Sequence, residues 1–354
     1  MKEILTEIDN IAKKIGSFEN KRKEVSIEIK ESLKGCKLGV GENLTNSIEK
    51  TGLNDIRIGG TDGGLVKKSY QGLDLILVRA VSAIFSYKDN KLEDVDYIPG
   101  VSPTPELKIY DNLQSKTDFS KAANISRLFR ETETILETLK GKSDLVLADG
   151  SILPHPSDVP KRKSPVYRDF KKLLSKYEEL YKLSGETQFA GVCEDSRARK
   201  FVRLIEGELE ISDKNELIKR SRDISLLNYM LKKGERSFVF RYSKNPKQNP
   251  ILNKLKGYGE NIYSFYMKNT HYDLPVRVDF YSEENPIKTA GKISSMIFNI
   301  SSDNEEYGLP TVLIEADRRA KISKNELEMI HSSIKDRCGD LPNLRDLNRR
   351  NRPF

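Results

Sequence analysis

The chain has 354 residues, of which 32% are charged and 37% are apolar, and its formal net charge is +8. No apolar run approaches the roughly 20 residues of a membrane-spanning helix, which excludes an integral membrane protein of that kind. Three widely spaced cysteines offer neither a disulfide framework nor a zinc knuckle, so the expected compartment is reducing and cytoplasmic. The excess of Lys and Arg fits either a polyanionic partner or a surface rich in both signs of charge.

The first 34 residues have the pattern of an amphipathic helix. Apolar residues recur there at steps of three and four, and Gly35 closes the segment. Because the apolar stripe is narrow, this arm (residues 1–54) is expected to pack on its own domain or on a second subunit. The stripe consists of Ile4, Leu5, Ile8, Ile11 and Ile15.

After the arm, apolar residues recur at every second position, which is the spacing of a β-strand. A short alternating run stops at the glycines of residues 59–64, and a long continuous apolar run follows. The predicted order is strand, strand, strand, helix, strand. The expected elements are strands at 56–58, 73–87 and 95–98, a helix at 125–139 and a strand at 145–148.

The rest of the chain continues the alternation of helices and strands. It favours one α/β core, residues 55–335, with a basic insertion at about 156–270, and a basic tail at 336–354. No internal repeat or low-complexity linker separates two domains. The expected elements are helices at 167–183, 217–231 and 324–334, and strands at 189–193, 275–280 and 310–314.

Two acidic residues share one arrangement in this pattern. Asp62 and Asp149 each follow an expected strand and each precede a glycine, and the helix between the two strands carries Glu133. Ligands collect at the carboxyl ends of strands in α/β sheets, and carboxylate oxygens suit magnesium or manganese. Asp-Gly after a strand is also an ordinary turn, and a helical Glu is usually a surface acid. The complete order, with its acids, is that of a ribonuclease H-like core.

Several segments resemble motifs of the NurA nuclease family, in the family's order and over about residues 55–335. The resemblance implies a ribonuclease H-like mixed sheet and a manganese-dependent nuclease that acts on DNA ends. Members are archaeal and bacterial, typically form homodimers, and work with the hexameric translocase HerA in end resection for DNA repair by homologous recombination. The segments are Ile58–Gly64, Leu145–Ser151, Phe189–Val192, Asp195–Arg197 and Leu313–Ala320.

The resemblance also implies site residues. The metal-binding acids of the family fall on Asp62, Glu133 and Asp149, and Asp317 stands where the family usually has a histidine. Glu194 stands where members often have a lysine. Asp317 would supply a fourth carboxylate, so the expected ions are Mn²⁺ and, as the second candidate, Mg²⁺.

These residues predict phosphodiester hydrolysis by a two-metal mechanism, in which one ion activates water and the other stabilises the leaving oxygen. Basic surface would hold single-stranded or end-processed double-stranded DNA by its backbone, with little sequence preference. An alternative is a DNA-binding adaptor of the translocase whose nuclease site has weakened, an interpretation suggested by Glu194 and Asp317. A more distant alternative is an actin-like or sugar-kinase-like ATPase that uses Gly-Thr-Asp-Gly-Gly as a phosphate loop; a second phosphate loop is not evident.

Overall fold

The computed structural model describes residues 1–70, 73–110, 115–185, 187–208, 215–302 and 304–338. The chain folds into two compact units, each assembled from separate segments of sequence. The residues of the predicted insertion at 156–270 are divided between the two. The first unit contains 1–52, 191–244 and 261–310, and the second unit contains 53–190, 245–260 and 311–354.

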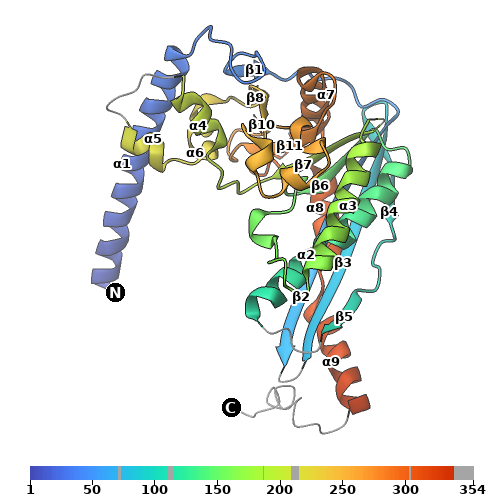
Figure 1. The fold of residues 1–354 in the computed structure, drawn as a ribbon. Helices are drawn as coiled ribbons and strands as arrows, with labels where there is room; N and C mark the ends of the chain where they lie inside the picture. The colour runs from blue at the N-terminus through green and yellow to red at the C-terminus, as the bar shows by residue number, and fades with distance from the viewer. Residues whose placement is uncertain (71–72, 111–114, 186, 209–214, 303, 339–354) are drawn as a thin grey trace. The chain divides into compact units, whose positions relative to one another are not determined.

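The second unit is built on a mixed sheet. β2 pairs with β3 in antiparallel fashion and with β6 in parallel, and β3 also pairs antiparallel with β4 and β5. Three antiparallel strands, a helix and a strand parallel to the first make the ribonuclease H-like order, as predicted (Figure 1). The strands are β2 (Ile56–Tyr70), β3 (Leu73–Lys88), β4 (Lys91–Ile98), β5 (Glu106–Tyr110) and β6 (Leu145–Asp149).

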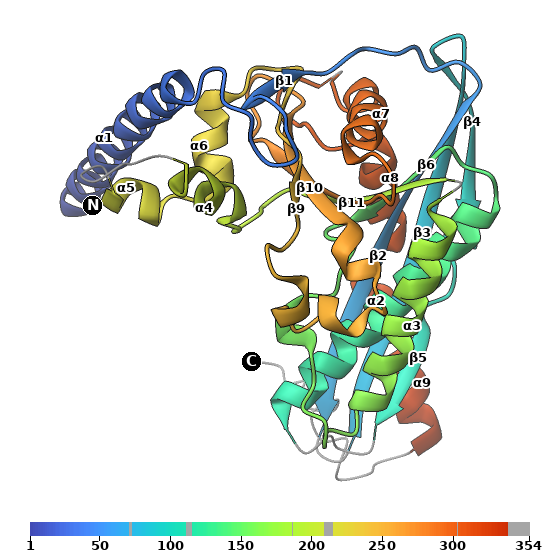
Figure 2. The same cartoon turned by 45° about the horizontal axis from the view of Figure 1, so that its top comes forward.

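Helices pack on both faces of this sheet. α2 and α8 both contact β2 and β3, and α2 and α3 lie side by side (Figures 1 and 2). Short 3₁₀ turns at 156–158, 246–248, 252–254 and 258–261 complete the irregular segments. The helices are α2 (Lys116–Lys140), α3 (Tyr167–Leu183), α8 (Thr311–Ala320) and α9 (Lys324–Cys338).

The first unit has its own antiparallel strands, in the order β1, β8, β10, β11, with β9 also on β10. β7 (Gln188–Cys193) spans the point where the chain passes from the second unit's segment into the first unit's. The strands are β1 (Thr45–Ser47), β8 (Glu235–Ser237), β9 (Phe240–Arg241), β10 (Ile262–Lys268) and β11 (Val276–Tyr281). The helices are α1 (Lys2–Ser32), α4 (Lys200–Glu206), α5 (Asn215–Arg220), α6 (Asp223–Met230) and α7 (Pro286–Asn299).

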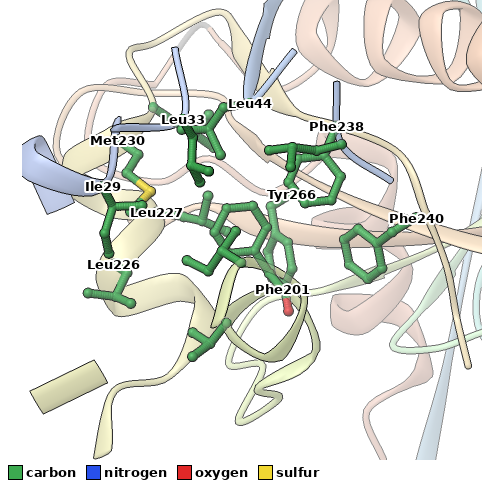
Figure 3. Packing of buried hydrophobic residues seen from close by; sticks show 14 of the residues in the cluster. Ile29, Leu33, Leu44, Phe201, Leu226, Leu227, Met230, Phe238, Phe240 and Tyr266 are labelled. Atoms are coloured by element: carbon green, nitrogen blue, oxygen red, sulfur yellow. The ribbon is translucent and has the colours of Figure 1, made fainter. Parts of the chain in front are cut away.

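An aromatic core fixes the predicted arm to the first unit. Ile29 and Leu33, at the end of α1, are buried against residues of α4, α6 and β10 in one apolar cluster (Figure 3). Phe201 and Phe238 stack at its centre, with ring centroids 5.2 Å apart. The N-terminal part of the stripe differs: its apolar side chains, from Ile4 to Phe18, are all at least 50% exposed. Within the described residues, no helix is long and apolar enough to cross a membrane.

The structure corrects four expectations. The strand expected at 310–314 is helical, because Val312, Ala316 and Ala320 repeat every four residues and are the buried side of α8. β2 does not stop at its glycines but continues to Tyr70. The helix expected at 217–231 is interrupted between α5 and α6, and α7 was not expected.

Candidate metal centre

Asp62 lies inside β2, at the point where the neighbouring strand β6 ends. The parallel register pairs Thr61 with Ala148, so the next positions on the two strands are Asp62 and Asp149. The prediction that Asp62 follows the end of its strand is therefore wrong, since Asp62 is paired with Val81 of β3 in the middle of a long ladder. Asp62 and Asp149 are nevertheless at neighbouring positions of the two strands, because β6 ends at Asp149 while β2 continues.

The glycines on either side of Asp62 let helices approach the strand closely. A Cβ at Gly59 would lie 2.7 Å from Cγ2 of Thr138 on α2, and one at Gly60 would lie 2.6 Å from the backbone of α8. A Cβ at Gly63 would overlap the carboxylate of Glu131 on α2, and one at Gly64 would overlap the end of α8. Successive positions of a strand face opposite sides, so α2 covers one face and α8 the other. Only glycine permits both approaches.

Glu131 is the helical acid of this site. Its carboxylate lies against Gly63, and its side chain is buried. The pKa of Glu131 is raised to about 8, chiefly by burial and also by the charges of Asp62 and Asp149, while Arg127 opposes the rise. A carboxyl group with a pKa this high, among like charges, is typical of a functional site.

Asp62 and Asp317 form the second contact between acids. Burial raises the pKa of Asp62, and the negative charge of Asp317 and a hydrogen bond with it raise the pKa further. The backbone N–H of Gly63 and the charge of Arg127 oppose this rise. Asp317 reaches this position from α8, and not from the end of a strand as expected.

Arg127 supplies positive charge to these acids. It stands one turn before Glu131 on α2 and forms an ion pair with it. Its charge also acts on Asp62 and on the phenol of Tyr177 from α3. The pKa of Tyr177 is raised, first by burial and then by Glu131, so this ring presents a neutral hydroxyl.

The structure does not bring Glu133, the expected helical ligand, to the acids. Its carboxylate pairs with Arg130 at 3.6 Å, and 31% of its side chain is exposed. Glu133 has the apolar Phe129 four residues before it on α2, a spacing that favours an inward face, but Phe129 is only half-buried and lies under Lys108. Leu128 and Ile135 are buried, and Glu131 stands three residues after the first and four before the second. That spacing was the signal for Glu131.

The chemistry of these side chains fits a hard divalent cation. Asp62, Glu131, Asp149 and Asp317 offer only carboxylate oxygens, the preferred ligands of magnesium and manganese. Two of the four have raised pKa values, first because they are buried and then because other acids lie near them. Within the described residues, however, no three His, Cys, Asp or Glu side chains already stand at the spacing of a metal site. Binding an ion would require these side chains to turn toward one another.

Known structures share this fold. The crystal structure of the NurA nuclease from Sulfolobus solfataricus is similar, with 18% identity and a TM-score of 0.61, over 96% of this chain and 98% of that chain. A crystal structure of NurA with manganese has 10% identity and a TM-score of 0.55, over 94% and 98% of the two chains. Identities this low establish a common fold and nothing finer.

The family comparison covers the residues that form the candidate centre. No curated protein matches the sequence. The family model described as the NurA domain matches residues 56–322, a range that contains all four acids. Because the matched range is well over half of the sequence, this chain belongs to the NurA domain family.

Proposed function

We propose that this protein is a manganese-dependent DNA nuclease that hydrolyses phosphodiester bonds. The observation that carries the proposal is that acids from β2, α2, β6 and α8 lie near enough to act electrostatically on one another where β6 ends: Asp317 acts on Asp62, and Asp62 and Asp149 act on Glu131. Asp62 and Glu131 are buried, and neighbouring acids raise the pKa of each, which costs stability in a sheet that has only a structural role. A hydrolase that depends on divalent cations uses such acids as metal ligands.

Asp62, Glu131, Asp149 and Asp317 would hold the ions; Glu131 takes the part first expected of Glu133. When bound, such ions supply Lewis acidity for the attacking water and the leaving oxygen of the phosphodiester. The fold of the chain holds these four acids in place. β2 and β6 hold two of the acids in register, and the glycines of β2 admit the other two from helices on opposite faces.

The proposed substrate and partner follow from family membership and charge. A net charge of +8 favours a polyanion, and basic side chains that contact phosphates give binding with little sequence preference. We place the reaction at DNA ends, single-stranded or processed from a duplex, in resection with a HerA-like hexameric ATPase. One similar structure is of a NurA with manganese, which supports the choice of ion.

The exposed stripe of α1 supports a homodimer. Ile4, Ile8, Ile11, Ile15 and Phe18 are spaced alternately by four and three residues, the heptad pattern of a coiled coil. All five are at least 50% exposed. A second copy of the helix, antiparallel and with Ile8 opposite Ile11, would cover both stripes.

The charges on α1 fit that arrangement. Glu7 and Lys14 both flank the stripe on one side, so Glu7 of each copy would face Lys14 of the other. We expect Ile11→Lys to convert a dimer to a monomer in light scattering, whereas Lys13→Ile, which leaves the stripe intact, should not. An unchanged mass for Ile11→Lys would contradict the dimer. Substitution is preferable to deleting the arm, because Ile29 and Leu33 belong to the first unit's core.

The nuclease proposal is tested by titrating manganese into the purified protein with a labelled single-stranded oligonucleotide. Asp62→Asn and Asp149→Asn should each abolish cleavage and leave DNA binding nearly intact, because they remove ligands and no basic groups. Asp96→Asn is the matched control, since Asp96 is an exposed acid paired with Arg57 on the same sheet. Wild-type cleavage by either site variant would refute the proposed centre. A wild-type protein that binds DNA without cutting it at any manganese concentration would instead be the adaptor.

A further inference from the structure

Arg127 occupies an unusual position for a helical ion pair. Its partner Glu131 lies one turn along α2, but the side chains are not equally accessible: 31% of the Arg127 side chain is exposed, against 10% for Glu131. An ordinary i,i+4 pair lies on a solvated face, as Arg130 and Glu133 do with 32% and 31% exposure. Arg127 therefore reaches inward from the rim to neutralise an acid that is itself buried.

The same guanidinium also serves a second acid. Its charge acts on Asp62 as well as on Glu131, although the two acids come from a strand and a helix. Asp62 and Glu131 are the two buried acids of the candidate centre, and the charge of Arg127 acts on both. It therefore stands where a metal ion would be attracted.

We infer that Arg127 is the resident counter-cation of the candidate centre and that it leaves Glu131 when a divalent ion binds. The inference rests on the proposed function, because it requires the acids to take up a cation. A guanidinium cannot be neutralised by losing a proton, so it cannot stay beside an incoming divalent ion without repulsion. Glu131 is buried and cannot turn away, whereas the long, flexible arginine side chain begins at the rim and can swing into solvent.

Arg127 is thus a positioning residue. In the metal-free protein it forms an ion pair with the buried Glu131 side chain, whose carboxylate lies against Gly63. When a divalent ion binds, it takes the place of the Arg127 guanidinium beside Glu131.

The test is a double-mutant cycle on the full-length protein, made of wild type, Arg127→Met, Glu131→Gln and the double variant. Thermal unfolding is measured in EDTA and again in saturating MnCl₂. In EDTA the two substitutions should be non-additive, with a coupling of roughly 3 °C or more in Tm. In manganese the coupling should fall close to zero, because the ion has already broken the pair. By linkage, Arg127→Met should bind manganese about 5-fold or more tightly than wild type in calorimetry.

The control cycle uses Arg130→Met and Glu133→Gln, the half-exposed pair on the next turn, whose small coupling should not depend on manganese. A coupling between Arg127 and Glu131 that persists in manganese would overturn the inference, since the pair would then survive in the loaded protein. That result differs from failure of the proposed function. If manganese does not stabilise the wild type at all, or stabilises Asp62→Asn equally well, there is no metal centre and the inference is refuted together with it.

Discussion

The two units bury charged side chains in opposite ways. In the first unit, the guanidinium of Arg277 donates to both carboxylate oxygens of Asp279 at 3.0 Å. Asp223 accepts three backbone N–H groups at the start of α4 and the hydroxyl of Tyr266 at 2.7 Å. In the second unit, Asp62 and Glu131 share one arginine and lie among further acids, each raising the pKa of another.

This difference separates structure from function better than burial does. Burial raises the pKa of Asp223 as well as that of Asp62. The partners are what differ: Asp223 is surrounded by donors, and Asp62 has a second carboxyl group as a neighbour. A buried acid with donors holds its surroundings together, whereas a buried acid facing another acid weakens the fold and is retained for another purpose. Substitutions of acids in the two units should have opposite effects, and they test this difference.

The largest expected effect is on cleavage, and it distinguishes two acids of α2. Glu131→Gln removes a ligand from the candidate centre and should reduce manganese-supported cleavage by at least roughly 100-fold, taking losses at supporting residues as a lower guide. Glu133→Gln should leave cleavage within about 2-fold of wild type, since exposed ion pairs contribute little. Rates on a labelled oligonucleotide decide between them. A loss confined to Glu133→Gln would restore the original assignment and remove Glu131 from the centre.

Glu131 and Glu133 also show which features of the structure could be predicted from the sequence. The order of strands and helix could be predicted because hydrophobic period and glycine placement are local properties. Which side of α2 faces the sheet could not, because Phe129 appears inward by spacing yet lies at the flank. The position of Arg127 depends on the same helix rotation. α8 was mistaken for a strand because Val312, Leu313 and Ile314 are β-prone, and packing on the glycines of β2 overrides that preference.

The second effect is on stability, in the first unit. Asp223→Asn places an NH₂ group where a carboxylate oxygen accepts a backbone N–H, so at least one donor at the start of α4 loses its partner. We expect the free energy of unfolding to fall by about 1–3 kcal/mol. Urea unfolding in EDTA at neutral pH measures it. Unchanged stability would mean that these hydrogen bonds do not hold α4 in place.

The smallest effect is the same chemical change in the second unit, with the opposite sign. The ordinary pKa of an aspartate is 3.8, and that of Asp62 is raised in the folded protein, so the folded state loses stability as the pH rises through this window and Asp62 ionises. Asp62→Asn removes the charge and can donate a hydrogen bond to Asp317. In EDTA at pH 7.5, the variant should therefore be more stable than wild type, by on the order of 1 kcal/mol. At a pH below 3.8 the difference should shrink, because Asp62 of the wild type is then protonated in both the folded and the unfolded protein. If Asp62→Asn were instead destabilised at pH 7.5, as expected of Asp223→Asn, Asp62 would be a structural acid and the contrast between the units would not hold.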